Sequence, residues 1–160
     1  MPLKPGKEAA LRKGRRWTNP APCTPCSESI HSAPGTSKLP RTEVIFFRED
    51  NGTVPLLSWL DKLPTKAQDK CRVRIERLKE LGHELRRPEA DLLRDGIHEL
   101  RVNLQGIKYR MLYFFHGNVA AVLSHGTMKE GIVPPREIEH AIERKRRFEQ
   151  NVARHTHREA

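Results

Sequence analysis

The sequence predicts an α+β domain in which an antiparallel sheet packs on helices, with the element order β-α-α-β-β-β-α. Three observations predict this class. Short β-branched and aromatic runs end at turn signals, helical periodicity of apolar residues appears in three other segments, and two tight-turn sequences join the last three runs. The length of 160 residues, with 36% hydrophobic and 31% charged residues, suits one domain of ordinary size.

The first predicted elements are a strand and two helices. Residues 43–48 are apolar, β-branched and aromatic, and a turn signal follows them, which indicates a strand. Apolar residues over 55–63 recur at i, i+3, i+4 and i+7, which predicts a short helix. A second helix is expected over 65–81, where Thr65 and Gln68 have the spacing of a capping box.

A polar loop over residues 83–97, with room for a short helical piece, is expected to separate these helices from the rest of the sheet. The following strands are predicted over residues 98–104, 107–115 and 119–124. Pro134 and Pro135 then open a final helix. Its apolar face is expected to comprise Ile138, Ala141, Ile142, Phe148 and Val152.

The turn at Gln105-Gly106 predicts which residues face each other in the central hairpin. A two-residue loop places Leu104 opposite Ile107 and therefore Arg101 opposite Arg110. One face then carries the apolar core residues His98, Leu100, Val102, Leu104, Tyr109, Met111, Tyr113 and Phe115. The other face carries Glu99, Arg101, Asn103, Lys108, Arg110, Leu112 and Phe114, and the second turn is expected to add Val119, Ala121, Leu123 and His125.

Two arginines that face each other across neighbouring strands repel each other. Either Glu99 neutralises Arg101 and Arg110 in a structural bridge, or the pair binds an external anion, since guanidinium groups match phosphate geometry. The pattern leaves both interpretations open. Asn103 and Lys108, on the same face, are further candidates for RNA binding.

His125 and Lys129 extend this patch beyond the last strand. His125 falls directly opposite Arg110 or diagonal to it, depending on the second turn, and the arginines are expected to lower its pKa. Such a group of cations beside a histidine, without a carboxylate pair or a cysteine cluster, fits metal-independent cleavage of RNA with the 2′-hydroxyl as nucleophile. No metal or other cofactor is expected.

Most of the net charge of +10 lies outside this domain. Residues 1–42 hold eight basic and two acidic residues among scattered prolines, which predicts a disordered basic extension. The extension is either a solvated tail or an arm that loosely holds nucleic acid. Cys23 and Cys26 form a CxxC motif without a second pair, so a zinc site is not expected. The chain has no apolar run of membrane-spanning length and no secretory signal.

Four short motifs occur in the order and spacing of a known family. They are Ile97-His-Glu-Leu-Arg101, Lys108-Tyr-Arg-Met-Leu-Tyr113, Ser124-His-Gly-Thr-Met-Lys129 and Pro134-Pro-Arg-Glu-Ile-Glu-His-Ala141. With the element order, they resemble the RelE/HigB-like toxins of type II toxin–antitoxin systems, in particular the phage-derived branch of the RelE/ParE superfamily. The resemblance covers about 43–152. It leaves the extension over 1–42 and a flexible tail over 153–160 outside.

The resemblance implies a cytoplasmic mRNA interferase, which is a metal-independent endoribonuclease that cleaves mRNA on the ribosome and inhibits translation. It also implies a helix-turn-helix antitoxin, similar to HigA, as partner. Carried over by position, Arg101 and Arg110 bind the phosphate and His125 performs acid–base work. Lys129 stabilises the phosphate or the leaving group, and Glu99 orients an arginine.

This sequence departs from the family pattern at two positions. The family often has an aromatic residue where Thr127 stands and a basic residue where Glu130 stands. An inactive copy, which would be a nucleic-acid-binding module without catalysis, is therefore one alternative. The other is a non-enzymatic gyrase inhibitor of the ParE type on the same fold.

Overall fold

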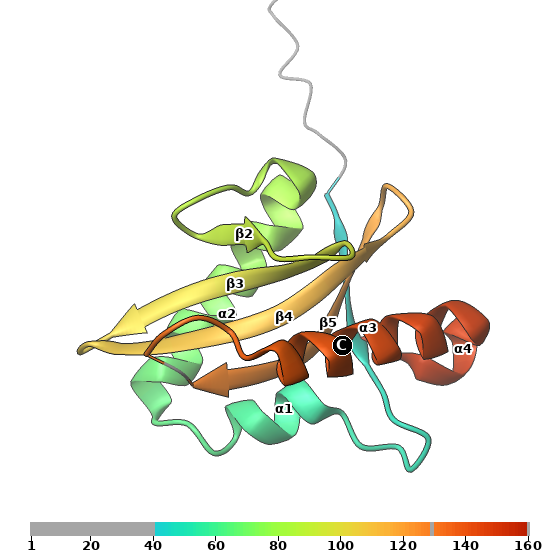
Figure 1. Ribbon diagram of the computed structural model, residues 1–160, viewed down its shortest axis with the longest axis horizontal. Coiled ribbons are helices and arrows are strands. Elements are labelled where there is room, and N and C mark those ends of the chain that lie inside the picture. The colour runs from blue at the N-terminus through green and yellow to red at the C-terminus, as the bar shows by residue number, and fades with distance from the viewer. Residues whose placement is uncertain (1–40, 129, 160) are drawn as a thin grey trace, which may run out of the picture. The chain divides into compact units, whose positions relative to one another are not determined.

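The computed structural model describes residues 41–128 and 130–159, and their centre is a mixed sheet. The extension over 1–42, except its last two residues, and the predicted site residue Lys129 lie outside the described residues. Within them the sheet has six strands in the order β2-β3-β4-β5-β1-β6 (Figure 1). The strands are β1 (Glu43–Phe47), β2 (Ala90–Leu92), β3 (Ile97–Leu104), β4 (Ile107–His116), β5 (Ala120–Met128) and β6 (Thr156–His157).

The helices are α1 (Pro55–Leu60), α2 (Thr65–Leu81), α3 (Pro135–Gln150) and α4 (Val152–His155), and a 3-10 turn, η1, covers Gly82–Glu84. The α+β class and the three longer helices are therefore confirmed. The predicted capping box is wrong, because Pro64 caps α2 and Thr65 is already its first helical residue. Gln68 instead donates its side-chain N–H to the carbonyl of Leu63 at 2.9 Å.

The sheet is mixed because β1 runs parallel to β5, from the pair Glu43↔Ala120 to Phe46↔Leu123. The other neighbouring strands are antiparallel. The sequence predicts an antiparallel sheet throughout, and it contains no clear signal for β2, which lies inside the expected loop and pairs with the start of β3.

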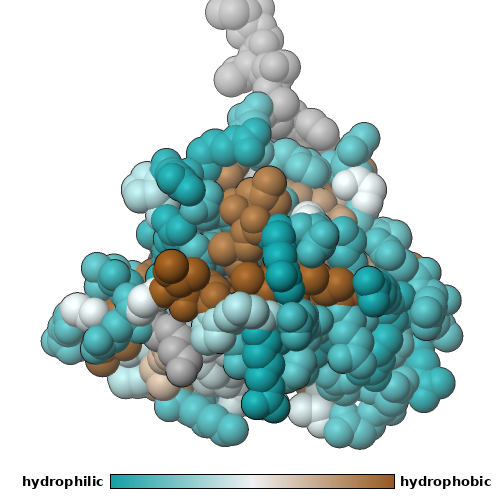
Figure 2. All heavy atoms as spheres, in the orientation of Figure 1, coloured by the Kyte–Doolittle hydropathy of each residue, from teal (hydrophilic) through white to brown (hydrophobic). Residues whose placement is uncertain are grey.

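Helices cover both faces of the sheet, with α2 behind it and α3 in front of it in Figure 1. The rear layer contains the predicted core face, since Leu100, Met111 and Tyr113 pack with α1 and α2. The front layer was not predicted. Leu112 and Phe114 are fully buried there, in one cluster with Ile138, Ala141 and Phe148 of α3. Figure 2 shows apolar side chains gathered above the sheet beside α3, with hydrophilic side chains around them.

The connection between β4 and β5 is one residue longer than either predicted turn. His116 pairs with Ala120, so the loop is Gly117-Asn118-Val119. Because each one-residue slip moves side chains to the opposite face, Ala121 and Leu123 lie in the rear layer, and their predicted place on the front face is wrong.

A bulge in β5 then corrects the slip. Tyr113 pairs with Leu123, but Leu112 pairs with His125, so Ser124 is the extra residue. His125 therefore returns to the face of Leu112, diagonal to Arg110. On β5, the residue directly opposite Arg110 is Thr127.

The C-terminal residues join the sheet, although a flexible tail was expected over 153–160. After α4, the short strand β6 pairs with the end of β1, at Phe46↔His157 and Phe47↔Thr156. The ring of His155 is buried and stacks on Phe47 with 5.1 Å between the ring centroids. Of the helices in the described part of the chain, none has the length and apolar character needed to cross a membrane.

Candidate functional site

The candidate site begins with the register of the β3–β4 hairpin, which the structure confirms. Arg101 pairs with Arg110 and Leu104 with Ile107. Both turn residues have positive φ, 53° at Gln105 and 82° at Gly106, as a two-residue turn that matches the twist of the strands requires. This turn therefore sets the two arginines side by side.

A buried carboxylate holds the two arginines together. Glu99 lies two residues before Arg101 on the same face of β3, and its side chain is only 1% exposed. Its Oε1 accepts a hydrogen bond from Nε of Arg101 at 2.7 Å, and its Oε2 accepts one from Nη1 of Arg110 at 2.8 Å. The structural bridge anticipated from the sequence is thus present, and one carboxylate faces two guanidinium groups.

The two guanidinium groups differ in their access to solvent. Arg101 is 37% exposed and also donates to Asp91 at 2.8 Å, which Arg87 contacts at 2.7 Å. Arg110 is 11% exposed and donates from Nη2 to the carbonyl of Gly131. Its Nε is buried and has no hydrogen-bond partner among the described residues. Arg101 is therefore the more open cation, and Arg110 is enclosed by its partners.

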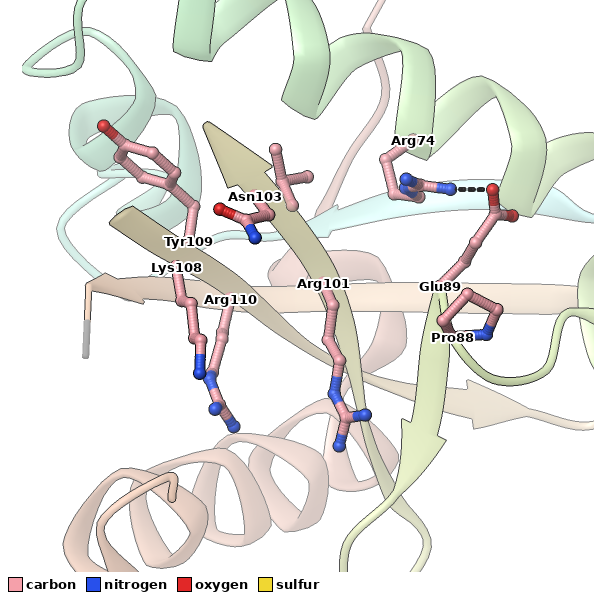
Figure 3. Close-up of a pocket in the computed structure, with 9 residues that line it drawn as sticks. Arg74, Pro88, Glu89, Arg101, Asn103, Lys108, Tyr109 and Arg110 are labelled. Carbon is pink, nitrogen blue, oxygen red and sulfur yellow. Dashed lines mark ion pairs between the residues drawn. The ribbon is translucent and has the colours of Figure 1, made fainter. Parts of the chain in front are cut away.

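Both arginines line an open pocket of about 540 Å³ at the hairpin end of the sheet. In Figure 3, Arg101, Lys108 and Arg110 extend to the same side of the two strands, and Tyr109 extends to the other. Lys108 is exposed and forms no ion pair with the residues that the structure describes. Asn103 is also exposed and completes the predicted set at this pocket.

The hydrogen bonds of His125 are made to residues other than these cations. Its Nε2 lies 3.0 Å from a carboxylate oxygen of Glu137 in the first turn of α3, and its Nδ1 lies 2.9 Å from the hydroxyl of Ser124. Because a carboxylate only accepts, Nε2 carries the proton, and Nδ1 accepts from Ser124. Both ring nitrogens are therefore occupied.

The pKa of His125 is lowered to about 4, mainly by burial and also by Arg144, while Glu137 opposes the shift. The lowered pKa was expected, but from Arg101 and Arg110, and its main cause is desolvation instead. At neutral pH the ring is uncharged, buried and bonded on both sides. This arrangement suits a structural link between β5 and α3 better than a proton donor.

Sequence reasoning missed the contributions of α2 and β2 to the site. Arg74 of α2 and Glu89 line the same pocket as the arginines, and Asp91 of β2 binds Arg101. The basic residues of α2 are visible in the sequence, but no local spacing places that helix beside the hairpin. Within residues 41–128 and 130–159, no three His, Cys, Asp or Glu side chains gather as metal ligands.

A family comparison places this geometry in a known class. Residues 58–146, more than half of the chain, match the family described as Phage derived protein Gp49-like (DUF891). This is a RelE-like family of toxins from toxin–antitoxin systems. The chain belongs to this phage-derived Gp49-like family, and the matched segment includes α2, the β3–β4 hairpin and most of α3. No curated protein matches the chain.

Proposed function

We propose that the protein is a RelE/HigB-like toxin that cleaves mRNA on the ribosome and thereby inhibits translation. The observation that carries the proposal is the pair Arg101 and Arg110, held side by side on Glu99 at the wall of an open pocket. Two guanidinium groups around one carboxylate retain an excess of positive charge, and their remaining N–H groups match the oxygens of a phosphodiester.

The proposed step is an internal transfer within the RNA. The 2′-oxygen loses its proton to a base and attacks the phosphorus, and the bond from phosphorus to the 5′-oxygen breaks. The products are a 2′,3′-cyclic phosphate and a 5′-oxygen, which takes up a proton and becomes a 5′-hydroxyl group. No metal takes part in this proposed step.

In this step Arg101, Arg110 and Lys108 stabilise the negative charge that develops on the phosphate oxygens. Lys129 retains its predicted role at the phosphate or the leaving group. The bonding of His125 favours a role in positioning α3 over a role in proton transfer.

The proposed partners follow from the same class. The ribosome presents the mRNA, and a helix-turn-helix antitoxin similar to HigA neutralises the toxin. The cationic pocket offers an anionic substrate a site near the tip of the hairpin. An antitoxin that covers this pocket would prevent cleavage by excluding the RNA.

Expression of the full chain in bacteria, followed by mapping of RNA 5′ ends, tests the proposal. The expected result is growth arrest with new 5′ ends inside translated codons. Arg101→Ala is the informative variant because Arg101 is 37% exposed, so the fold tolerates its loss better than the loss of the enclosed Arg110. Arg72→Ala, at an exposed position of α2 that does not line the pocket, is the control.

Three outcomes contradict the proposal in different ways. Growth arrest with DNA damage and intact mRNA would indicate a gyrase inhibitor of the ParE type. Binding of RNA without toxicity would indicate an inactive nucleic-acid-binding module. Full cleavage by Arg101→Ala would show that the reacting phosphate lies elsewhere.

A further inference from the structure

A groove runs between α2 and the end of β3 and continues the pocket of the two arginines. A second pocket of about 390 Å³ shares Arg74, Glu89, Val102 and Asn103 with the first one. The two pockets therefore form one continuous groove. It leads from Lys108 and Arg110 at the hairpin, past the edge of the sheet, to Lys70 and Arg77 on α2.

The groove exists because β2 is too short to cover β3. The pairing of β2 with β3 ends at Ala90↔Leu100, and the last backbone hydrogen bond runs from Arg101 N to the carbonyl of Glu89 at 2.8 Å. Beyond it the described residues place no strand on the outer edge of residues 102–104, whose other edge pairs with β4. The edge of β3 therefore faces the side chains of α2 across open space.

The groove carries a net positive charge, although Glu99, which binds Arg101 and Arg110, and Asp91, which binds Arg101, offset part of it. Its lining contains six basic side chains (Lys70, Arg74, Arg77, Arg101, Lys108 and Arg110) and two acidic ones (Asp69 and Glu89). Glu89 binds both Arg74 and Arg77, the second at 2.8 Å, so one carboxylate again serves two guanidinium groups.

Of the three α2 cations that line the groove, Lys70 is the most available to a ligand, because Arg74 and Arg77 both bind Glu89. Lys70 is exposed, and its only hydrogen bond to the described residues is a long one of 3.4 Å from Nζ to the carbonyl of Asn103. Val73, one turn along the helix, is 62% exposed and lines the same groove. A cation beside an apolar surface suits a nucleotide, which carries a phosphate and a flat base.

We infer that this groove holds the single-stranded RNA that flanks the cleaved bond, with Lys70 on a phosphate. The inference rests on the proposed function, because it takes the phosphate between Arg101 and Arg110 as the starting point of the strand. Continuity of the groove with that pocket favours RNA over an acidic peptide. The strand then crosses the free edge of β3 at Asn103.

Binding of a ten-nucleotide 2′-O-methyl RNA to the full chain, measured by fluorescence anisotropy at several salt concentrations, tests the inference. The 2′-O-methyl groups prevent cleavage. We expect Lys70→Ala to weaken binding about tenfold and to lower the salt slope by about 0.7, as the loss of one contact with a single-strand phosphate requires. Arg72→Ala removes the same charge from an exposed position of α2 outside the groove, and we expect a change below about twofold by the same reasoning.

A trinucleotide of the same chemistry separates the groove from the cleavage site. We expect so short an RNA to favour the arginine pocket, so its affinity should fall more with Arg101→Ala than with Lys70→Ala. Equal effects of Lys70→Ala and Arg72→Ala on the ten-nucleotide RNA would overturn the inference, because they would reflect net charge alone. Tighter, Lys70-dependent binding of a deca-glutamate peptide would overturn it in favour of an acidic peptide.

The outcomes also distinguish this inference from the proposed function. Cleavage in cells together with RNA binding that Lys70→Ala does not weaken would refute the groove but would still support the proposed nuclease activity. RNA binding that depends on Lys70, without cleavage in cells, would support the groove and refute the nuclease. Absence of RNA binding by the unaltered chain would refute the groove, whereas the mapping of RNA 5′ ends in cells decides the nuclease.

Discussion

Replacement of Glu99 by Gln should destabilise the protein far more than the loss of an ordinary surface carboxylate. The substitution preserves shape but removes the carboxylate that pairs with Arg110, whose side chain is 11% exposed. Breaking a buried ion pair from one side costs about 3–5 kcal/mol. Arg101 is 37% exposed and keeps its ion pair with Asp91, so it contributes little to the loss of stability. We therefore expect the lower end of the range, about 3 kcal/mol.

Urea unfolding at neutral pH measures this loss, with Glu139→Gln as the matched control. Glu139 forms a single ion pair with Arg94 at 3.3 Å, and both side chains are about half exposed or more, at 65% and 49%. Exposed pairs contribute about 0–1 kcal/mol, so the control should remain close to the unaltered chain. If the free energy of unfolding of Glu99→Gln also lies within about 1 kcal/mol of that of the unaltered chain, the Glu99 carboxylate does not support the arginine pair.

Three further predictions concern other parts of the core. Gly126→Ala should lower the free energy of unfolding by about 1–3 kcal/mol in urea, because the added Cβ would lie 2.1 Å from the ring of Trp59; an unchanged midpoint would refute that packing. The pKa of His125 in the folded chain is about 4, below its ordinary value of 6.5. Between these two pH values the unfolded chain therefore binds more protons than the folded chain, and stability falls as the pH falls. From pH 7 to pH 5 the unaltered chain should lose about 2 kcal/mol more than His125→Gln, and parallel losses would contradict the assignment. Burial raises the pKa of the Cys71 thiol to about 11, so iodoacetamide at pH 8 should modify it only in denaturant; rapid modification of the folded chain would show that α2 opens.

The parts of the fold that depend on local chemistry could be predicted from the sequence. The turn at Gln105-Gly106 specifies a two-residue loop, and the register of Arg101 and Arg110 follows by counting. Glu99 was also expected beside an arginine, because side chains two residues apart share one face of a strand. The geometry of these three residues therefore needed no information beyond the hairpin.

The remaining errors arise where distant segments meet. The turn after His116 has no signal that distinguishes two residues from three, and one residue is enough to exchange the faces of β5. The bulge at Ser124 then moves His125 away from the position opposite Arg110. The parallel pairing of β1 with β5 also lacks a local signal, because it joins segments more than seventy residues apart.

The site was incomplete for the same reason. Arg74 reaches the hairpin only through the packing of α2 on the rear of the sheet, and Asp91 only through the short strand β2. The front layer buries Leu112 and Phe114 under α3, although their strand pattern left the position of that helix open. Tertiary packing therefore decided which polar residues of the predicted front face are accessible.

The position of β1 has a consequence for the synthesis of the protein. This strand is the first of the domain to be made, but its neighbours in the sheet are β5 and β6, the last two strands of the chain. Until residues 120–128 have emerged from the ribosome, β1 has no partner among the strands, and its outer edge stays open until residues 156–157 follow. Contacts so distant in sequence form late. The sheet around β1 can therefore be completed only after residues 156–157 have been synthesised.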